Sequence, residues 1–437
     1  MSKIHNPKSS PGPASQIQNT KYKIQNGLSQ PRVAIVHDWL YGGGAEMVVL
    51  ELHKMFPEAP IYTSFSTNEW RQKLDNKVVT GYLQNWPFAK LRKFLPVLRQ
   101  HWFKNLDLSE FDLIISSSGN GEAKFVLSGK KQKAKSKKFL ANSKPKDVDN
   151  QTSDAQRPLH ICYCNTPTHF YWRKYEEYLK NPGFKPKWLV RLGLKLLVKP
   201  LRERDYKAAQ NVDYFIANSS HIQNDIKEYY GRSSIVIHPP VDVDGFSKKQ
   251  KAKSKKSESF SPSDIRYQIS NMDATRPFVM WGRHVPYKRF DIAIRACNEL
   301  KLPLVIAGQG PATTELKKLA GPTITFTGFV SKEELIDLAS HSKAFLFPAE
   351  EDFGIAPVEA MAMGLPVIAY KSGGALDYIT KETGLFFDEQ TVKSIIYTIN
   401  SLSDKDFDSA LISNAATKFS RENFQIKLSA LLSSKLL

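Results

Sequence analysis

The sequence predicts an α/β protein of two domains, each built on a doubly wound parallel sheet, with the two sheets facing a central cleft. Three observations support this prediction: the length, the alternation of short apolar runs with helical segments, and a break that separates two such series. The 437 residues are long for one domain and sufficient for two of about 200 residues each. Apolar residues make up 41%, which is enough for two cores and excludes global disorder.

The first series begins with RVAIVH (32–37), a β-branched run followed by the glycine turn Gly42-Gly43-Gly44. The helical stretch AEMVVLELHKM (45–55) comes next and stops before Pro57. In a doubly wound sheet the carboxyl ends of the strands are typically followed by small or polar residues. Further apolar runs with such endings are DLIISSS (112–118), LHICYC (159–164), DYFIANS (213–219) and SIVIHPP (234–240).

The second series consists of short apolar runs separated by one helical segment each. Strands spaced in this way imply right-handed crossovers and a parallel sheet. Ligands bind at the carboxyl ends of such strands, so two tandem sheets predict a cleft between them. The runs are 278–282, 303–308, 324–329, 344–349, 366–370 and 384–387.

The charge of +19 is concentrated in one repeated string. KKQKAKSKK occurs at 130–138 and 248–256 and contributes twelve lysines, without which the net charge is +7. A duplicated lysine-rich string with no core residues is typical of a solvated loop insertion, with an anionic lipid or polymer as the alternative partner. We therefore expect no nucleic-acid partner.

Domain boundaries follow from these changes in composition. Residues 1–30 are polar, lack the apolar core of a secretory signal and are expected to be a disordered tail. No run of 18 uncharged apolar residues is present, so no membrane span is expected. Three cysteines, Cys162, Cys164 and Cys297, form no disulfide framework and fit a reducing cytoplasm; the first two are interpreted as buried strand residues rather than a metal pair. The predicted units are 31–240 (first domain, with a basic insertion at about 129–157), 241–270 (linker and second insertion), 271–420 (second domain) and 421–437 (a helix that could cross back to the first domain).

The stretch EEDFGIAPVEAMAMGLPVIAY (350–370) is the most informative for chemistry. Glu351 and Glu359 lie eight residues apart, around a turn that contains Phe353, Gly354 and Ile355. A helix is expected to begin near Ala356, and its free N–H groups suit a diphosphate or sugar oxygens. Glu359, one turn in, can accept two ribose hydroxyls, and Glu351 stands at the sugar. The alternative is that both are ordinary surface acids.

A second element, GRHVPYKRFD (282–291), follows a strand and precedes an amphipathic helix. Arg283 and Lys288 are expected to face the cleft, where fixed cations stabilise the charge that develops on a leaving nucleoside diphosphate. Arg289 is assigned to the surface. Gly43 and Gly44, in the turn after the first strand, are expected to approach a phosphate from the opposite wall. This turn is not GxGxxG, and no acidic ribose-binding residue stands at the expected spacing, so a nicotinamide site is disfavoured.

Together these residues resemble glycosyltransferase family 4, of the two-domain GT-B class, from Arg32 to about Phe424. The most specific parts are GRHVPYKRFD, GFVSKEEL, the Glu351/Glu359 segment and SGGALD (372–377); IANSSHIQNDIKEYYGRSSIVIHPPVD (216–242) is similar to the interdomain approach of that family. The resemblance implies the GT-B fold, retention of anomeric configuration, no divalent metal or other cofactor, and a nucleotide-diphosphate sugar as donor, such as GDP-mannose or a UDP-hexose. It places the diphosphate at Arg283 and Lys288, the donor sugar at Glu351 and the ribose at Glu359. Backbone contacts would come from Phe353, Gly354 and Ile355, and Phe329 and Val330 would flank the base.

One position departs from the family pattern. Members often carry His before Thr-Pro in the segment matching YCNTPTHFYW, and here that position is Asn165, with His169 four residues on. Either His169 substitutes for it on the acceptor side, or it is a core or surface histidine. Because a retaining transferase can use the phosphate of the donor as base, no enzyme base is required.

The segment KPKWLVRLGLKLLVKPLRER (185–204) has basic residues at four-residue spacing beside a row of Trp188, Leu192 and Leu196. This pattern is typical either of a helix lying on an anionic membrane or of a core helix with a solvated basic face. The resulting hypothesis is a cytoplasmic hexosyltransferase, with mannose as a candidate donor sugar, that is peripheral on the inner face of the membrane. Its acceptor would be a saccharide or a lipid-linked acceptor in cell-envelope polysaccharide synthesis. The alternatives are a nucleotide-sugar epimerase of the same fold and a basic protein that binds anionic polymers.

Overall fold

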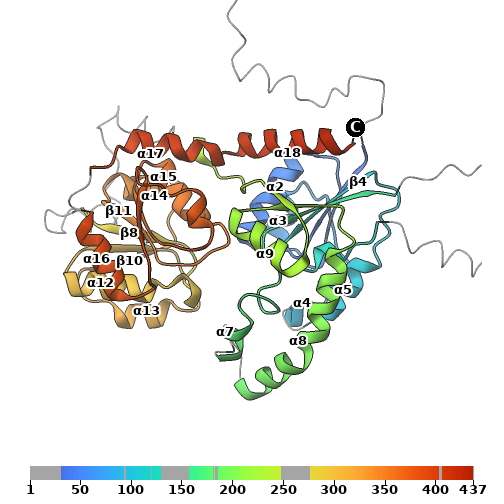
Figure 1. Cartoon of the computed structure of the whole chain (residues 1–437), viewed down its shortest axis with the longest axis horizontal. Helices are drawn as coiled ribbons and strands as arrows, with labels where there is room; N and C mark the ends of the chain where they lie inside the picture. Colours follow the sequence, from blue (N-terminus) through green and yellow to red (C-terminus); the bar gives the residue numbers. More distant parts are fainter. Residues whose placement is uncertain are drawn as a thin grey trace, which may run out of the picture.

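The computed structural model contains two α/β domains (Figure 1). It describes residues 31–92, 95–119, 121–128, 157–180, 182, 186–247, 276–402 and 406–436. The predicted tail, both KKQKAKSKK strings and most of the predicted linker lie outside these residues.

The first domain has a seven-stranded sheet in the order β3-β2-β1-β4-β5-β6-β7, with every pair parallel. Strand β1, an interior strand, is buried at all five positions, because helices cover both faces and strands pair on both sides. The strands are β1 (Val33–His37), β2 (Ile61–Thr63), β3 (Val78–Val79), β4 (Leu113–Ser118), β5 (Leu159–Cys164), β6 (Tyr214–Ala217) and β7 (Ser234–Val236). The α-helices are α2 (Ala45–Met55), α3 (Asn68–Lys73), α4 (Phe88–Leu91), α5 (Pro96–Lys104), α7 (Tyr175–Lys180), α8 (Lys187–Ala209) and α9 (Ser220–Tyr230).

The second domain has a six-stranded parallel sheet in the order β10-β9-β8-β11-β12-β13. The strands are β8 (Phe278–Trp281), β9 (Leu304–Ala307), β10 (Ile324–Gly328), β11 (Ala344–Phe347), β12 (Val367–Tyr370) and β13 (Gly384–Phe387). The helices are α12 (Phe290–Leu300), α13 (Thr313–Leu319), α14 (Lys332–Ser340), α15 (Ile355–Ala362), α16 (Val392–Ser401) and α17 (Ser409–Ala416), with the 3₁₀ turns η4 (Pro286–Lys288) and η5 (Gly373–Asp377). The predicted fold class, two doubly wound parallel-sheet domains, is confirmed.

The last helix, α18 (Arg421–Leu436), runs along the first domain (Figure 1). Its residues Phe424, Leu428 and Leu432 are buried in the same apolar cluster as Ile35 of β1. The ring of Phe424 lies edge-on to Tyr163, with centroids 5.9 Å apart. The final helix therefore contributes to the core of the first domain although it follows the second in sequence.

Strand order reverses between β1 and β4 in the first domain and between β8 and β11 in the second. The loops that leave a sheet at such a switch point diverge and open a crevice at its carboxyl edge. The loops in question begin after His37, Ser118, Trp281 and Phe347. They contain the glycine turn, Gly119, Lys288 and Glu351, so the fold directs these residues toward one region.

Candidate active site

A cavity of about 740 Å³ lies between the two domains and is lined by residues from both. Ten of the thirteen predicted site residues line it: Gly43, Gly44, Asn165 and His169 from the first domain, and Lys288, Glu351, Phe353, Gly354, Ile355 and Glu359 from the second. Arg283, Phe329 and Val330 are not among the lining residues. Arg283 is exposed, and the Phe329 side chain is 80% exposed.

The amino end of α15 forms one wall of this cavity. Gly354 precedes the helix with φ +89°, a conformation that glycine adopts without strain, and no side chain caps the helix. A Cβ on Gly354 would lie 2.8 Å from Tyr378 Oη and 2.9 Å from Phe347 Cζ. The turn is thus packed closely from behind, while the first N–H groups of α15 carry the partial positive charge of a helix amino end.

The glycine turn of the first domain reaches the same helix end from across the cleft. A Cβ on Gly44 would lie 3.0 Å from Cδ1 of Ile355, the first residue of α15. The two walls are therefore in near contact at this point. A Cβ at position 44 would press on the far end of the Ile355 side chain.

Lys288 and Glu351 meet inside the cavity as an ion pair. Lys288 Nζ donates to Glu351 Oε1 at 2.5 Å, and the side chains are 16% and 18% exposed. Burial opposes the charged form of Lys288, but the nearby Glu351 carboxylate outweighs it, and the pKa of Lys288 is raised above its ordinary value. The backbone at Lys288 belongs to regular structure: η4 ends at Lys288 and α12 begins two residues later.

Glu359, the fifth residue of α15, points toward the end of β8. Its Oε2 accepts a hydrogen bond from Trp281 Nε1 at 3.1 Å. Burial raises the pKa of Glu359 above its ordinary value, against the effects of the Trp281 hydrogen bond and Lys332. Both Glu359 and Trp281 line the cavity, so a carboxylate and its indole partner are available to a ligand there.

On the first-domain side, Asn165 is held by its neighbours. Its Nδ2 donates to Ser117 Oγ at 3.1 Å, and its carbonyl accepts from Asn218 Nδ2 at 2.8 Å. His169 lies across the cleft from the second domain, with Nε2 3.1 Å from Asp352 Oδ2. The His169 side chain is 31% exposed.

Two charged residues at this interface were not predicted: Asp352, and Arg173, which donates to Asp352 Oδ1. Burial alone would raise the pKa of Asp352, but His169 and Arg173 outweigh it and hold the pKa of this carboxyl below its usual range. Asp352 directly follows Glu351, which was a usable signal. Arg173 stands 179 residues from its partner, and no local pattern marks it.

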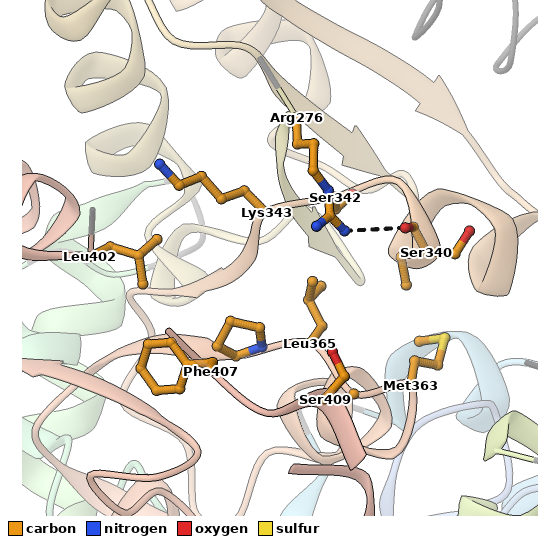
Figure 2. A pocket seen from close by; sticks show the side chains of 12 residues that line it. Arg276, Ser340, Ser342, Lys343, Met363, Leu365, Leu402, Phe407 and Ser409 are labelled. Carbon is orange, nitrogen blue, oxygen red and sulfur yellow. Dashed lines mark hydrogen bonds between the residues drawn. The ribbon is translucent and has the colours of Figure 1, made fainter. Parts of the chain in front are cut away.

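A second, smaller hollow of about 220 Å³ lies in the second domain (Figure 2). Arg276, Lys343 and Pro366 line it, and they precede β8, β11 and β12 respectively. It is therefore at the amino edge of the sheet, opposite the edge that faces the cleft, and none of the predicted site residues lines it.

Residues 265–419 match the model of a family described as "Glycosyl transferases group 1". The chain is 30% identical, over 33% of its length and 31% of the relative, to the sulfoquinovosyl transferase SQD2 of Arabidopsis thaliana. It is 28% identical, over 45% of its length and 54% of the relative, to a GDP-mannose-dependent alpha-(1-6)-phosphatidylinositol monomannoside mannosyltransferase of Mycolicibacterium smegmatis. The chain thus spans about a third and about half, respectively, of these curated relatives.

Among solved structures, Anabaena Alr3699/HepE in complex with UDP-glucose has a TM-score of 0.62 at 18% identity, covering 93% of this chain and 100% of that one. The sucrose-phosphate synthase of Thermosynechococcus elongatus has a TM-score of 0.58 at 16% identity, covering 93% and 99%. At these identities the likeness shows the fold, which is GT-B. The predicted resemblance to glycosyltransferase family 4 is confirmed.

Proposed function

We propose that this chain, a group 1 glycosyltransferase with the GT-B fold, transfers a hexosyl group from a nucleotide-diphosphate sugar to a saccharide or lipid-linked acceptor. In this proposal the transfer retains anomeric configuration and needs no divalent metal. The donor sugar is proposed to be mannose, since the named activity of the M. smegmatis relative is GDP-mannose-dependent. In the same proposal the reaction belongs to cell-envelope polysaccharide synthesis and takes place on the cytoplasmic side of the membrane.

One observation carries the proposal: Lys288, Glu351 and the amino end of α15 border a single cavity between the domains. A leaving nucleoside diphosphate gains negative charge as the glycosidic bond breaks. The Lys288 ammonium and the α15 N–H groups would stabilise that charge, so that protein groups supply the role a metal ion has in other transferases. Arg283 would add a second cation by turning its exposed side chain toward the diphosphate.

The remaining roles follow the position of each group along the cavity. Glu359 would hold the ribose hydroxyls and Glu351 the donor sugar, after its ion pair with Lys288 opens to admit the diphosphate. Gly43 and Gly44 would close on the phosphates from the first domain, and Phe329 and Val330 would flank the base. Asn165 and His169 face the acceptor side, and a donor phosphate oxygen would take the proton from the acceptor.

Two measurements test the proposal. A thermal-shift panel of nucleotide sugars identifies the donor, because a donor at about 100-fold its dissociation constant adds roughly 2.7 kcal/mol of stability. Transfer to an added acceptor, with and without a metal chelator, then separates a transferase from an epimerase of the same fold, which needs no acceptor. No stabilisation by any nucleotide sugar, or epimerisation of the donor without an acceptor, would refute the proposal. Loss of turnover in His169→Ala with donor binding intact, and without a comparable loss in Asp352→Asn, would instead assign the base to His169.

The proposed peripheral contact with an anionic membrane is supported by α8. Its first half extends beyond the body of the first domain (Figure 1) and carries five exposed large apolar side chains. Trp188 and Leu189 are 66% and 51% exposed, and Leu192, Leu196 and Leu197 are also exposed. Lys195 and Lys199 stand among them and are exposed as well. An apolar patch rimmed by lysines matches the headgroup region of an anionic bilayer. Among the residues described, no helix is both long and apolar enough to cross a bilayer.

Flotation with vesicles tests this contact. The wild type should float with phosphatidylglycerol-containing vesicles at low salt, and a Leu192→Gln/Leu196→Gln variant should not. Ile426→Gln is the matched control, since Ile426 is also 53% exposed but lies on α18. Equal flotation of the wild type and the double variant would remove α8 from the proposal.

A further inference from the structure

The loop between β11 and α15 belongs to the second domain but is held by side chains of the first. Asp352 is the contact residue. Its carboxylate binds Arg173, and His169 Nε2 lies 3.1 Å from Oδ2. Ser219 Oγ, at the start of α9, donates to the backbone carbonyl of Asp352 at 2.5 Å. Three residues of the first domain thus converge on this one position.

Arg173 is itself fixed within the first domain. One guanidinium nitrogen donates to Asp225 Oδ2 of α9 at 2.8 Å, while another donates to Asp352. The side chains of Arg173, Asp225 and Asp352 are 17%, 8% and 19% exposed. Charges so far withdrawn from water are costly to leave unpaired, so the network favours the arrangement in which Asp352 is docked.

Docking of Asp352 also fixes its neighbour. The carbonyl of Glu351 accepts from Gly374 N at 2.9 Å, and a Cβ on Gly373 would lie 2.3 Å from that carbonyl oxygen. The backbone carbonyls of Glu351 and Asp352 are therefore held by Gly374 of η5 and by Ser219, respectively. The Glu351 side chain extends from this backbone segment into the cavity, where its Oε1 lies 2.5 Å from Lys288 Nζ.

We propose that Asp352 is a positioning residue for sugar transfer: by binding Arg173 and His169 it docks the β11–α15 loop on the first domain and sets Glu351 opposite the acceptor side. This inference rests on the proposed function, because it gives Glu351 a role at the donor sugar. It adds that donor and acceptor loops are aligned with each other by a charged contact outside the reacting groups. In this proposal His169 acts by orienting the loop through its contact with Asp352.

A second carboxylate across the same interface provides a comparison. Asp377 of η5 accepts from Ser220 N at 2.8 Å, and His238 Nε2 lies 2.9 Å from the same carboxylate. Asp377 therefore also joins the domains, but it does not lie in the β11–α15 loop. If loss of either carboxylate had the same effect, the contact would serve domain closure in general and not the placement of Glu351.

The experiment compares Asp352→Asn, Arg173→Gln, Arg173→Lys and Asp377→Asn in the full chain. Misplacement of a reacting group by about 1 Å can cost roughly 100-fold in rate. We therefore expect Asp352→Asn and Arg173→Gln to lower kcat by about 10- to 100-fold. The donor dissociation constant should stay within about threefold, since the second domain holds most of the donor contacts.

Arg173→Lys should give an intermediate loss of kcat, because an ammonium does not span Asp225 and Asp352 as a guanidinium does. Asp388→Asn is the control, since Asp388 is 77% exposed and pairs with Lys371, away from the loop.

Amide hydrogen exchange gives a readout that does not depend on turnover. Exchange in peptides covering 350–354 and 165–174 should rise in Asp352→Asn and Arg173→Gln and stay unchanged in Asp388→Asn. Unchanged exchange, kcat within about twofold of wild type, or an equal kcat loss in Asp377→Asn would overturn the positioning role. A wild type that binds no nucleotide sugar, with exchange responding as expected, would instead refute the proposed function and leave only the docking contact.

Discussion

Lys288 Nζ lies 2.5 Å from Glu351 Oε1, so the cation and the carboxylate that flank the proposed donor site neutralise each other. A diphosphate carries more negative charge than one carboxylate and would compete for the ammonium. In the absence of a ligand, the Glu351 carboxylate thus pairs with the largely buried Lys288 ammonium. It also ties η4 to the β11–α15 loop, so both sides of the site are preformed.

Replacing Lys288 with Ala should remove a cation that acts mainly in the transition state. Losing one preorganised charge-stabilising group costs about 2–4 kcal/mol, or roughly 30- to 1,000-fold in kcat/KM. Steady-state kinetics with the identified donor measures this. Arg289→Ala is the matched control: Arg289 is the next residue, but it pairs with Asp291, and its activity should stay within about twofold. Comparable losses in both variants would argue against a specific role for Lys288.

Replacing Glu359 with Gln should weaken donor binding more than it slows transfer. Gln keeps an oxygen for the Trp281 N–H but loses the charge that accepts ribose hydroxyls. Hydrogen bonds to a charged group contribute about 1.5–3 kcal/mol, so the donor dissociation constant should rise by roughly 10- to 100-fold. Isothermal titration calorimetry checks this, with Glu389→Gln as the exposed control in the same domain. An unchanged dissociation constant would remove Glu359 from the ribose site.

Gly354→Ala should lower the thermal midpoint. A non-glycine residue at φ +89° is strained, and the new Cβ would press on Tyr378 Oη and Phe347 Cζ. Together these effects should destabilise the second domain by about 1–3 kcal/mol. Gly193→Ala is a control of opposite sign, because Gly193 lies inside α8 with open space around its Cβ position, and alanine should be neutral or stabilising there. Differential scanning calorimetry of both variants compares them.

Much of this architecture could be predicted from the sequence because its signals are local. Helix α2 occupies Ala45–Met55, the stretch that helical periodicity indicated, and the buried strands of both sheets appear as continuous apolar runs. The two-residue strand β3 and the three-residue strand β2 were not predicted, although β7, which also has three residues, was. Helix α8 continues through Pro200 to Ala209, beyond the predicted segment.

The site was predictable where one loop holds several residues, and less so where distant segments meet. Glu351, Gly354, Ile355 and Glu359 stand on one strand–turn–helix unit, so spacing places them together. The Arg173–Asp352 contact depends on how the two domains pack, which one sequence does not encode in any local pattern. Side-chain direction is similarly undetermined: Arg283 follows β8 as expected, yet it is exposed and does not line the cavity.

The last prediction concerns acid stability and His160, which is buried on β5 with Nε2 2.8 Å from Ser116 Oγ. Burial lowers the pKa of His160 from 6.5 to about 4, against the attraction of Asp213. Between these values the unfolded chain binds a proton that the folded chain does not, so the free energy of unfolding falls as the pH decreases from about 6.5 to 4. The full loss from this group is about 3 kcal/mol. Above pH 6.5 the histidine is neutral in both states and contributes no slope. His160→Gln should therefore flatten the decline in thermal midpoint between pH 6.5 and pH 5, whereas the exposed His341→Gln should leave it unchanged. Parallel pH profiles for wild type and His160→Gln would show that other groups control acid unfolding.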